Sequence, residues 1–387
     1  MTSIRLPQED GTITVYETGE PHSFQKPTAK LTSRRPFAAV HVVADPLADN
    51  NSVSPARLDW DATLAFRRHL WSWGMSVADA MDTAQRGMGL DWEATRELIV
   101  RSTAEAKSVG GDIACGANTD QLPEGPAEIG KIIDAYLEQV TLIEESGGQA
   151  VMMASRNLAA TATGLEDYQH VYRAVLSQAS RPVVVHWLGE MFDPLLAGYW
   201  GGADLDTASD GFIAILNENA TSVDGVKISL LEKEREVDLR RRLPEGLRMY
   251  TGDDFNFPEL IAGDGEHYSD AFLGAFDILA PAASAAIQAL DAGETDQFEK
   301  ILSPTVPLAR HVFAAPTFYY KTGVVFMAYL NGHQGHFRMV NGQEVSRSVV
   351  HLSRQFTLAD QAGLLEDPDL AVHRMGLVLE LAGIAQT

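Results

Sequence analysis

The segment VDGVKISL at residues 223–230 is short, mostly apolar and rich in β-branched side chains. This composition predicts a buried strand. Because successive side chains of a strand point to opposite faces, Val226, Ile228 and Leu230 share one apolar face that suits packing against helices. Lys227 lies on the other face, among small residues. The segment therefore predicts a single lysine within a strand that is covered on both sides.

Burying the ammonium group of Lys227 without a partner is costly, and such a group tends to lose its proton instead. A neutral lysine is a nucleophile that can form a Schiff base with a carbonyl substrate. The alternative is a lysine at a strand end, whose amine reaches water or pairs with a carboxylate. The segment alone leaves both interpretations open.

Length and composition restrict the class of protein. The chain has 387 residues, of which 45% are hydrophobic and 21% charged, and this suits an eight-fold α/β barrel with additions. Its 53 acidic and 30 basic residues give a formal net charge of −23. Such a field repels phosphate backbones and anionic membranes, so binding to nucleic acid or to a membrane surface is not expected.

Cysteine usage and the apolar runs indicate a compartment. Cys115 is the single cysteine of the sequence, which excludes an internal disulfide and favours a reducing environment. The first residues lack the apolar core of a signal peptide, and no run reaches the roughly 18 apolar residues of a membrane helix. We therefore expect a cytoplasmic protein.

Strand-like and helix-like segments alternate along most of the chain. The expected strands are 37–44, 76–82, 112–115, 149–154, 181–188, 223–230, 247–251 and 276–280. Eight such units predict an α/β fold of the (β/α)8 TIM-barrel type. An open doubly wound sheet has the same local pattern, but no GxGxxG fingerprint follows the first strand and no P-loop is present.

Three parts of the chain are expected. Residues 1–35 form an N-terminal extension, in which Asp10-Gly11 between apolar pairs indicates a hairpin. Residues 36–281 form the barrel. Residues 282–387 lack strand signals and form a C-terminal helical domain.

The active site of such a barrel lies at the carboxyl ends of its strands. Polar residues gather at the expected ends: His41, Asp45, Thr83, Arg86, Asn118, Thr119, Ser155, Arg156, His186, Lys227, Asp253 and Asp254. The strand bodies are apolar, so this pattern suits a pocket.

Four motifs resemble the dihydrodipicolinate synthase and N-acetylneuraminate lyase family of class I aldolases. They are GVKIS at 225–229, TGDD at 251–254, CGANT at 115–119 and YKTGV at 320–324. The resemblance covers roughly residues 36–350 and implies a barrel followed by a helical domain, with Lys227 as the Schiff-base residue. It also implies that no organic cofactor is needed, because the iminium itself is the electron sink.

Two places depart from the family pattern. The family has a Thr-Thr pair after the second strand for the carboxylate of pyruvate, and only Thr83 matches it here. The family has a tyrosine after the fourth strand, where this chain reads Met153-Ala154-Ser155. The standard synthase or sialic-acid lyase activity is therefore not expected, and the Schiff base would be kept in rebuilt surroundings.

Several residues are candidates for the rebuilt site. His186 can act as acid or base near neutral pH, or it can be a core histidine with satisfied hydrogen bonds. Arg86 and Arg156 can bind a carboxylate or phosphate through a bidentate fork, or form salt bridges with the many acidic residues.

Further polar residues have equally open roles. Asn118 and Asp253 hold substrate or shape their turns, and Ser155 replaces the family tyrosine only through water. His333 and His336 suggest a metal by composition, but we expect a solvated loop there.

The interpretation we favour is a class I lyase or aldolase acting on a small keto acid or keto-sugar derivative, without cofactor or metal. The carbonyl substrate is the expected partner, and a homo-oligomer is expected. One alternative is a metal-assisted barrel lyase or isomerase using His41, Asp45, His186 and Asp253. The other is a barrel that binds a metabolite without catalysis.

Overall fold

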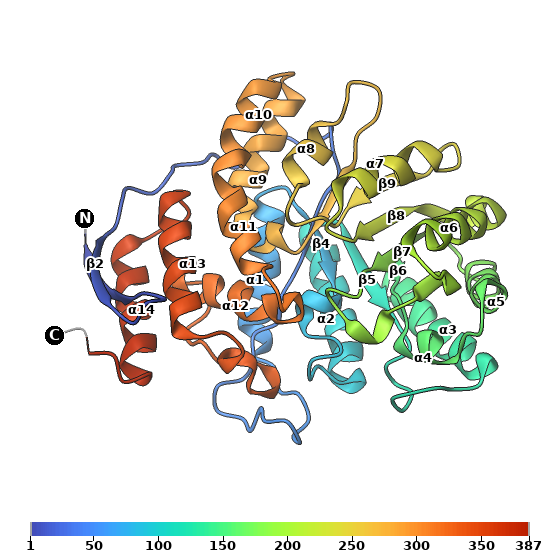
Figure 1. Cartoon of the computed structure of the whole chain (residues 1–387), viewed down its shortest axis with the longest axis horizontal. Helices are drawn as coiled ribbons and strands as arrows, with labels where there is room; N and C mark the ends of the chain where they lie inside the picture. The colour runs from blue at the N-terminus through green and yellow to red at the C-terminus, as the bar shows by residue number, and fades with distance from the viewer. Residues whose placement is uncertain (1, 386–387) are drawn as a thin grey trace.

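The computed structural model describes residues 2–385, and in this range eight parallel strands close into a barrel (Figure 1). The strands are β3 (Pro36–Ala39), β4 (Ser76–Asp79), β5 (Ile113–Ala117), β6 (Gln149–Met152), β7 (Val183–Leu188), β8 (Val223–Ser229), β9 (Arg248–Thr251) and β10 (Asp270–Leu273). Each strand pairs with its neighbour along the chain, and β10 closes the ring on β3. The (β/α)8 fold is thus confirmed.

Helices follow the strands and cover the outside of the barrel (Figure 1). They are α1 (Trp60–Ser72), α2 (Trp92–Val109), α3 (Ile129–Ser146), α4 (Arg156–Thr161), α5 (Leu165–Leu176), α6 (Leu205–Asn219), α7 (Lys233–Arg242) and α8 (Phe257–Ala262). Local sequence sets their ends. The Asp91 side chain accepts from Ala94 N at the start of α2, and α3 ends at Gly147 with a φ of 100°, which glycine adopts without strain.

Aromatic and aliphatic side chains fill the inside of the barrel. Phe37 of β3 stacks on Phe272 of β10, with ring centroids 4.9 Å apart, and Val184 and Tyr250 belong to the same buried cluster. This packed interior leaves the carboxyl ends of the strands as the place for a site.

The eighth strand was expected at residues 276–280, and this expectation is wrong. Those residues lie in α9 (Ala275–Asp291), while β10 (Asp270–Leu273) precedes them. Residues 275–280 are all buried, so the helix has no polar face to reveal its period, and a short apolar run does not distinguish strand from helix. The expected boundary between residues 281 and 282 falls inside α9.

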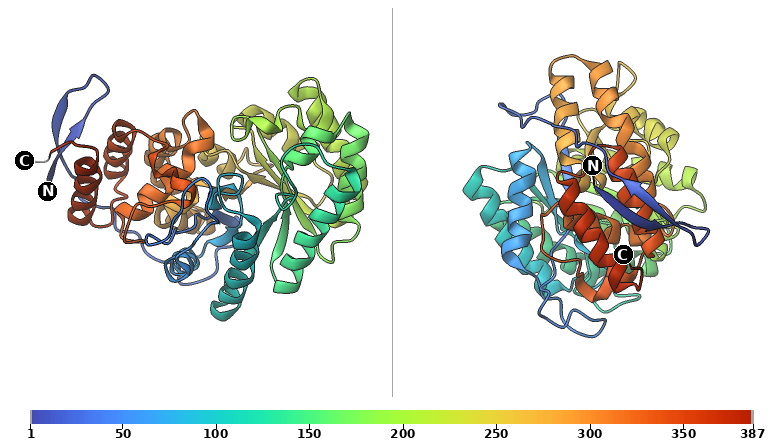
Figure 2. Two further views of the ribbon diagram at one scale, coloured as in Figure 1. Left: turned by 90° about the horizontal axis from the view of Figure 1, so that it is seen from below. Right: turned by 90° about the vertical axis from the view of Figure 1, so that its left-hand side faces the viewer.

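The C-terminal part is helical, as expected. It comprises the end of α9, then α10 (Thr295–Leu302), α11 (Val306–Val312), α12 (Tyr320–Leu330), α13 (Val349–Gln361) and α14 (Pro368–Leu381). Figure 2 shows these helices as a body beside the barrel, in orange and red. Helix α12 is buried along its whole length, and it lies between the barrel and the outer helices.

The expected N-terminal hairpin is present. Strands β1 (Ser3–Pro7) and β2 (Ile13–Glu17) pair in antiparallel fashion and lie against α13 and α14 at the end of the molecule remote from the barrel (Figure 1). The Tyr16 hydroxyl donates to Asp360 Oδ2 of α13 at 2.7 Å. Residues 1, 386 and 387 of the expected terminal parts lie outside the described range.

No helix between residues 2 and 385 combines the length and the apolar composition that a membrane crossing requires.

Candidate active site

Lys227 lies inside the barrel, on the face that strand alternation predicts. Its register partners are His186 on β7 and Tyr250 on β9, and its side chain is 6% exposed. The amine lies 4.7 Å from the centre of the Phe272 ring. Within residues 2–385 no atom accepts a hydrogen bond from it at normal distance, so the amine is buried without being tied to one acceptor.

Burial lowers the pKa of Lys227 from 10.5 to about 8, although the charges of Asp82 and Asp254 work in the opposite direction. Asp82 begins the turn after β4 and is partly exposed, and Asp254 follows β9. Both positions are carboxyl ends of strands, so the amine faces the mouth of the barrel. A substantial share of neutral amine is available near pH 8.

The two carboxyl groups near Lys227 differ in how they are held. Burial raises the pKa of Asp254 to about 7, against the Ala275 N–H and the charge of Lys227; that N–H donates to Asp254 Oδ1 at 2.7 Å. Burial also raises the pKa of Asp82, while Lys321 and Lys227 lower it. A carboxyl group that titrates near neutrality can give and take protons at working pH.

Gly252 allows this arrangement because β9 passes very close to β8. A Cβ atom at residue 252 would lie 2.9 Å from Lys227 Cε and 2.9 Å from Ile228 O, and closer still to Ser229 Oγ. Such approaches are far below van der Waals contact. The glycine of the TGDD motif therefore makes room for the lysine side chain.

Helix α12 brings two further polar residues to the mouth. The Tyr320 hydroxyl lies 2.8 Å from Thr83 Oγ1, which joins α12 to the turn after β4. Lys321 is 2% exposed, and its amine donates to Phe318 O at 3.1 Å. Burial lowers the pKa of Lys321 to about 8, while Asp82 and Asp193 raise it.

His186 is fully buried beside Lys227. Its Nε2 lies 3.1 Å from Ser229 Oγ, and its Nδ1 has no hydrogen-bond partner among the described residues. Burial, and then the charge of Lys227, lower the pKa of His186 well below its ordinary value. The imidazole is therefore neutral at physiological pH, and its role as acid or base stays a prediction.

Arg86 is held by the protein itself. Its guanidinium donates to Asp120, to the carbonyls of Ala80 and Gly116, and to Gln139 Oε1. These contacts occupy all five N–H donors of the group. The structure thus places Arg86 as a brace between the turns after β4 and β5, with no donor left for a substrate.

Arg156 is more exposed than Arg86. Its Nε donates to Asp193 Oδ2 at 2.6 Å, and one terminal nitrogen donates to Gly87 O at 3.3 Å. The side chain is 28% exposed, and its charge lowers the pKa of Lys321. Arg156 remains a candidate for an anionic group.

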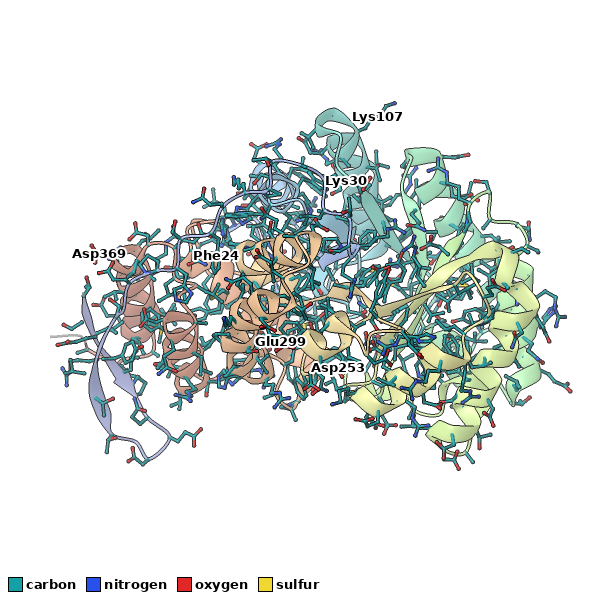
Figure 3. All side chains as sticks on the ribbon, turned by 90° about the horizontal axis from the view of Figure 1, so that it is seen from above. Phe24, Lys30, Lys107, Asp253, Glu299 and Asp369 are labelled. Carbon is teal, nitrogen blue, oxygen red and sulfur yellow. The ribbon has the colours of Figure 1, made fainter. Side chains whose placement is uncertain are left out.

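Three other predicted substrate-binding residues are engaged in turns. Asn118 Oδ1 accepts from Thr119 N at 2.8 Å, and Ser155 caps α4 by accepting from Leu158 N at 3.0 Å. Asp253, labelled in Figure 3, accepts from two backbone N–H groups and a side-chain amide at the start of α8. It is the neighbouring Asp254 whose charge acts on Lys227.

Sequence reasoning passed over Asp82, Lys321 and Tyr320 as site residues. Asp82 stands at an expected strand end beside the candidate Thr83, but it was given no role. Lys321 is the only charged residue of α12, and a single charge in an apolar helix is a signal of a buried polar function. The fold was needed to show that α12 reaches the barrel mouth.

The four residues of the metal-assisted alternative are not brought together. His41 Nδ1 lies 2.8 Å from Asp277 Oδ2 on α9, His186 pairs with Ser229, and Asp253 shapes its turn. Among residues 2–385 one group of three possible metal ligands is gathered, and it includes none of His41, Asp45, His186 or Asp253.

Comparison with solved structures places the barrel in a class. The fold is that of dihydrodipicolinate synthases: the enzyme of Aquifex aeolicus matches with a TM-score of 0.63 at 12% identity, over 86% of this chain and 100% of that chain. The Thermotoga maritima enzyme matches at 0.63 and 13%, over 86% and 100%. The 4-hydroxy-tetrahydrodipicolinate synthase of Methylacidiphilum fumariolicum matches at 0.60 and 14%, over 86% and 99%. The resemblance carried by the four motifs is thus confirmed in the fold.

By sequence, the chain belongs to the family described as protein of unknown function (DUF993), whose model matches residues 4–384. No curated protein matches its sequence.

Proposed function

We propose that the protein is a class I lyase or aldolase in which Lys227 forms an imine with a small carbonyl substrate. The observation that carries this proposal is the Lys227 amine: it is buried at the carboxyl end of the barrel, lacks a fixed acceptor, and has its pKa lowered to about 8. Amines activated by desolvation in this way are the nucleophiles of Schiff-base enzymes. The fold shared with dihydrodipicolinate synthases supports the same assignment.

The proposed reaction begins with attack of the neutral amine on the substrate ketone, which gives a carbinolamine. Loss of water then gives an iminium on Lys227. The iminium accepts the electron pair of a carbon–carbon bond that breaks next to it, or of a C–H bond whose proton a base removes from the adjacent carbon, and an enamine forms. An enamine that carries a neighbouring hydroxyl group can expel it as water with a proton from an acid, which regenerates an iminium. Protonation of the enamine and hydrolysis return the free lysine and the product.

Asp82 and Asp254 are the proposed proton carriers. Both lie close enough for their charges to act on Lys227, and burial raises the pKa of each carboxyl group. A carboxyl group with a pKa near 7 can protonate the departing hydroxyl of the carbinolamine and later take a proton from the substrate. His186, neutral beside Lys227, is proposed to orient the amine rather than to exchange protons with solvent.

The proposed substrate is a keto acid or keto sugar with further hydroxyl groups, not pyruvate alone. Asp82 occupies part of the place where the related family binds the pyruvate carboxylate, and two carboxylates at one site repel each other. Asp82 and Asp254 can accept hydrogen bonds from hydroxyl groups instead. Lys321, on which the charge of Asp82 acts, and Arg156 supply the positive charge for an acidic group.

Borohydride trapping tests the proposal. The protein is incubated with each of a panel of keto acids and keto sugars, reduced, digested, and analysed by mass spectrometry. One adduct per chain is expected, on the peptide that contains Lys227. Lys107→Ala is the matched control, since Lys107 is exposed and projects from the end of α2 (Figure 3).

The variants decide between the alternatives. Lys227→Ala should lose both the adduct and turnover, and Lys107→Ala should keep both. If a substrate were turned over undiminished by Lys227→Ala, the Schiff-base mechanism would be wrong. If ligands bind to Lys227→Ala and to the wild type alike, with no adduct and no turnover, the barrel would be a binding protein.

A further inference from the structure

Two imidazoles and a carboxylate meet where α1 packs against the C-terminal helices. His69 lies in the last turn of α1, His333 follows α12, and Glu366 precedes α14. One ligand atom from each lies within 4.8 Å of the other two. The His69 and His333 rings are in contact, with centroids 4.2 Å apart. We infer that these three residues form a binding site for a divalent transition-metal ion of the zinc type.

One asparagine joins the backbone segments that carry His333 and Glu366. Asn331 Nδ2 donates to Leu364 O at 2.9 Å, and its Oδ1 accepts from Glu366 N at 3.1 Å. The His333 N–H donates to Ala328 O at 3.0 Å. The two C-terminal segments that carry His333 and Glu366 are therefore joined before any ion binds, as a preformed site requires.

A cavity of about 40 Å³ adjoins the group. Its lining includes Phe66 and Phe24, the latter on the N-terminal segment where it runs beside the C-terminal helices (Figure 3). Asp277 also lines it, and Asp277 Oδ1 is a buried carboxylate oxygen without a hydrogen-bond partner in the described chain. A buried acceptor without a partner is costly. A space of this size holds an ion with bound water, which would supply that partner.

The donor set suits zinc and its neighbours. Two imidazole nitrogens and one carboxylate oxygen are the ligands of three-coordinate protein sites that keep a fourth position for water. Tetrahedral ligands at zinc distances lie roughly 3.3 Å apart, so binding needs a small contraction of the group. Glu366 is 45% exposed and His333 Nε2 is already 3.5 Å from its carboxylate, so the carboxylate is free to move inward.

Charge and protonation around the group are compatible with a cation. Burial, and then the neighbouring His333, lower the pKa of His69 to about 4, while Glu366 raises it. Lys26 lies near enough to lower the pKa of both His69 and Glu366, and it is the positive charge that opposes an ion here.

The group of His69, His333 and Glu366 is separate from Lys227. His333 was expected in a solvated loop, but its side chain is only 18% exposed. The ion would link a barrel helix to two C-terminal segments, so its expected effect is on stability and not on the chemistry at the barrel mouth.

Metal loading of the full chain tests the site. The protein is stripped with a chelator, reloaded with Zn²⁺ or Co²⁺, and freed of excess ion. Elemental analysis should find one ion per chain, Co²⁺ should give the strong visible bands of four-coordinate geometry, and Tm should rise on loading. His333→Gln and Glu366→Gln each remove a direct ligand and should weaken metal binding by at least about 10–100-fold, which is the usual cost of losing a residue that only hydrogen-bonds to a ligand.

His336→Gln is the matched control. His336 lies in the same loop, outside the cavity lining, and its Nδ1 accepts from Arg338 N at 3.1 Å. This variant should load like the wild type. The inference is overturned if the wild type takes up no ion, or if His333→Gln and Glu366→Gln keep wild-type affinity. It is also overturned if His336→Gln loses binding equally. Because Glu366 is exposed, Glu366→Gln should fold normally, and the circular dichroism spectrum of the stripped variant checks this.

Discussion

Strand β8 and helix α12 each carry one buried lysine to the barrel mouth, and the two lysines differ in their contacts. Lys227 and Lys321 are 6% and 2% exposed, and burial lowers the pKa of both to about 8. The Lys321 amine donates to the Phe318 carbonyl, whereas no acceptor in the described chain holds the Lys227 amine. Burial thus lowers the pKa of both lysines. The hydrogen bond to Phe318 O anchors the Lys321 amine, whereas the Lys227 amine is free to react.

The comparison predicts that only one of the two lysines is a nucleophile. Lys227→Met should abolish borohydride-trapped adduct and reduce turnover to background, because the reacting atom is gone. Lys321→Met should still form the adduct, while kcat/KM for an acidic substrate falls. Trapping and steady-state kinetics measure both. If Lys321→Met lost the adduct and Lys227→Met kept it, the roles of the two lysines would be reversed.

Gly252→Ala should cause the next largest effect, because the new methyl group meets the Lys227 side chain as well as Ser229 Oγ and Ile228 O, whereas Lys321 is not among its neighbours. The new methyl group would meet Lys227 Cε at 2.9 Å, and a misplacement of about 1 Å can cost on the order of 100-fold in rate. The rate of imine formation should fall about 10–100-fold, with Lys321 unaffected. Gly130→Ala, at a position with open space, is the control and should leave the rate unchanged.

Both lysines should cost stability, whatever their role. The pKa of each in the folded chain lies below the ordinary 10.5, so between pH 8 and 10.5 the unfolded chain binds more protons and the free energy of unfolding rises with pH. Below about pH 8 the penalty is complete. At pH 7 Lys227→Met and Lys321→Met should each stabilise by about 1–3 kcal/mol, in urea unfolding measurements. A destabilised Lys321→Met would show that its hydrogen bond outweighs its burial.

Asp82→Asn tests the shared electrostatics through the pH dependence of imine formation, where the smallest of these effects is expected; the loss of turnover that removal of a proposed proton carrier causes is separate from it. The Asp82 carboxylate raises the pKa of both lysines, so its neutralisation should lower both pKa values. The acid limb of the pH profile for imine formation should move to lower pH, by about half a unit to one unit. A shift to higher pH would contradict the placement of Asp82 beside Lys227.

The sequence defined the barrel and Lys227 because both depend on local patterns. Strand alternation alone sets the inward direction of Lys227, and seven of the eight strands lie where they were expected, although residues 76–82 are only weakly patterned. The prediction of the eighth strand was wrong because β10 has only four residues and the apolar run after it forms a helix that is buried on nearly all sides. Nothing local distinguishes those two cases.

The surroundings of Lys227 depend on contacts between distant parts of the chain. Arg86 was a candidate for substrate binding, but it donates to Asp120 and Gln139, which lie 34 and 53 residues away in the sequence. Tyr320 meets Thr83 across 237 residues. Such pairs have no signature in a single sequence. The sequence therefore predicted which polar residues follow the strands, but not what each of them contacts.

The arrival of α12 at the barrel mouth has an evolutionary consequence under the proposed function. The eight repeats of the barrel supply the amine and its proton carriers, while Lys321 and Tyr320 come from a segment outside those repeats. Substitutions in α12 can therefore change which molecules are accepted without disturbing β8, against which Gly252, directly after β9, packs too closely to admit a larger residue. Related proteins can therefore differ in substrate specificity while they keep the same Schiff-base chemistry.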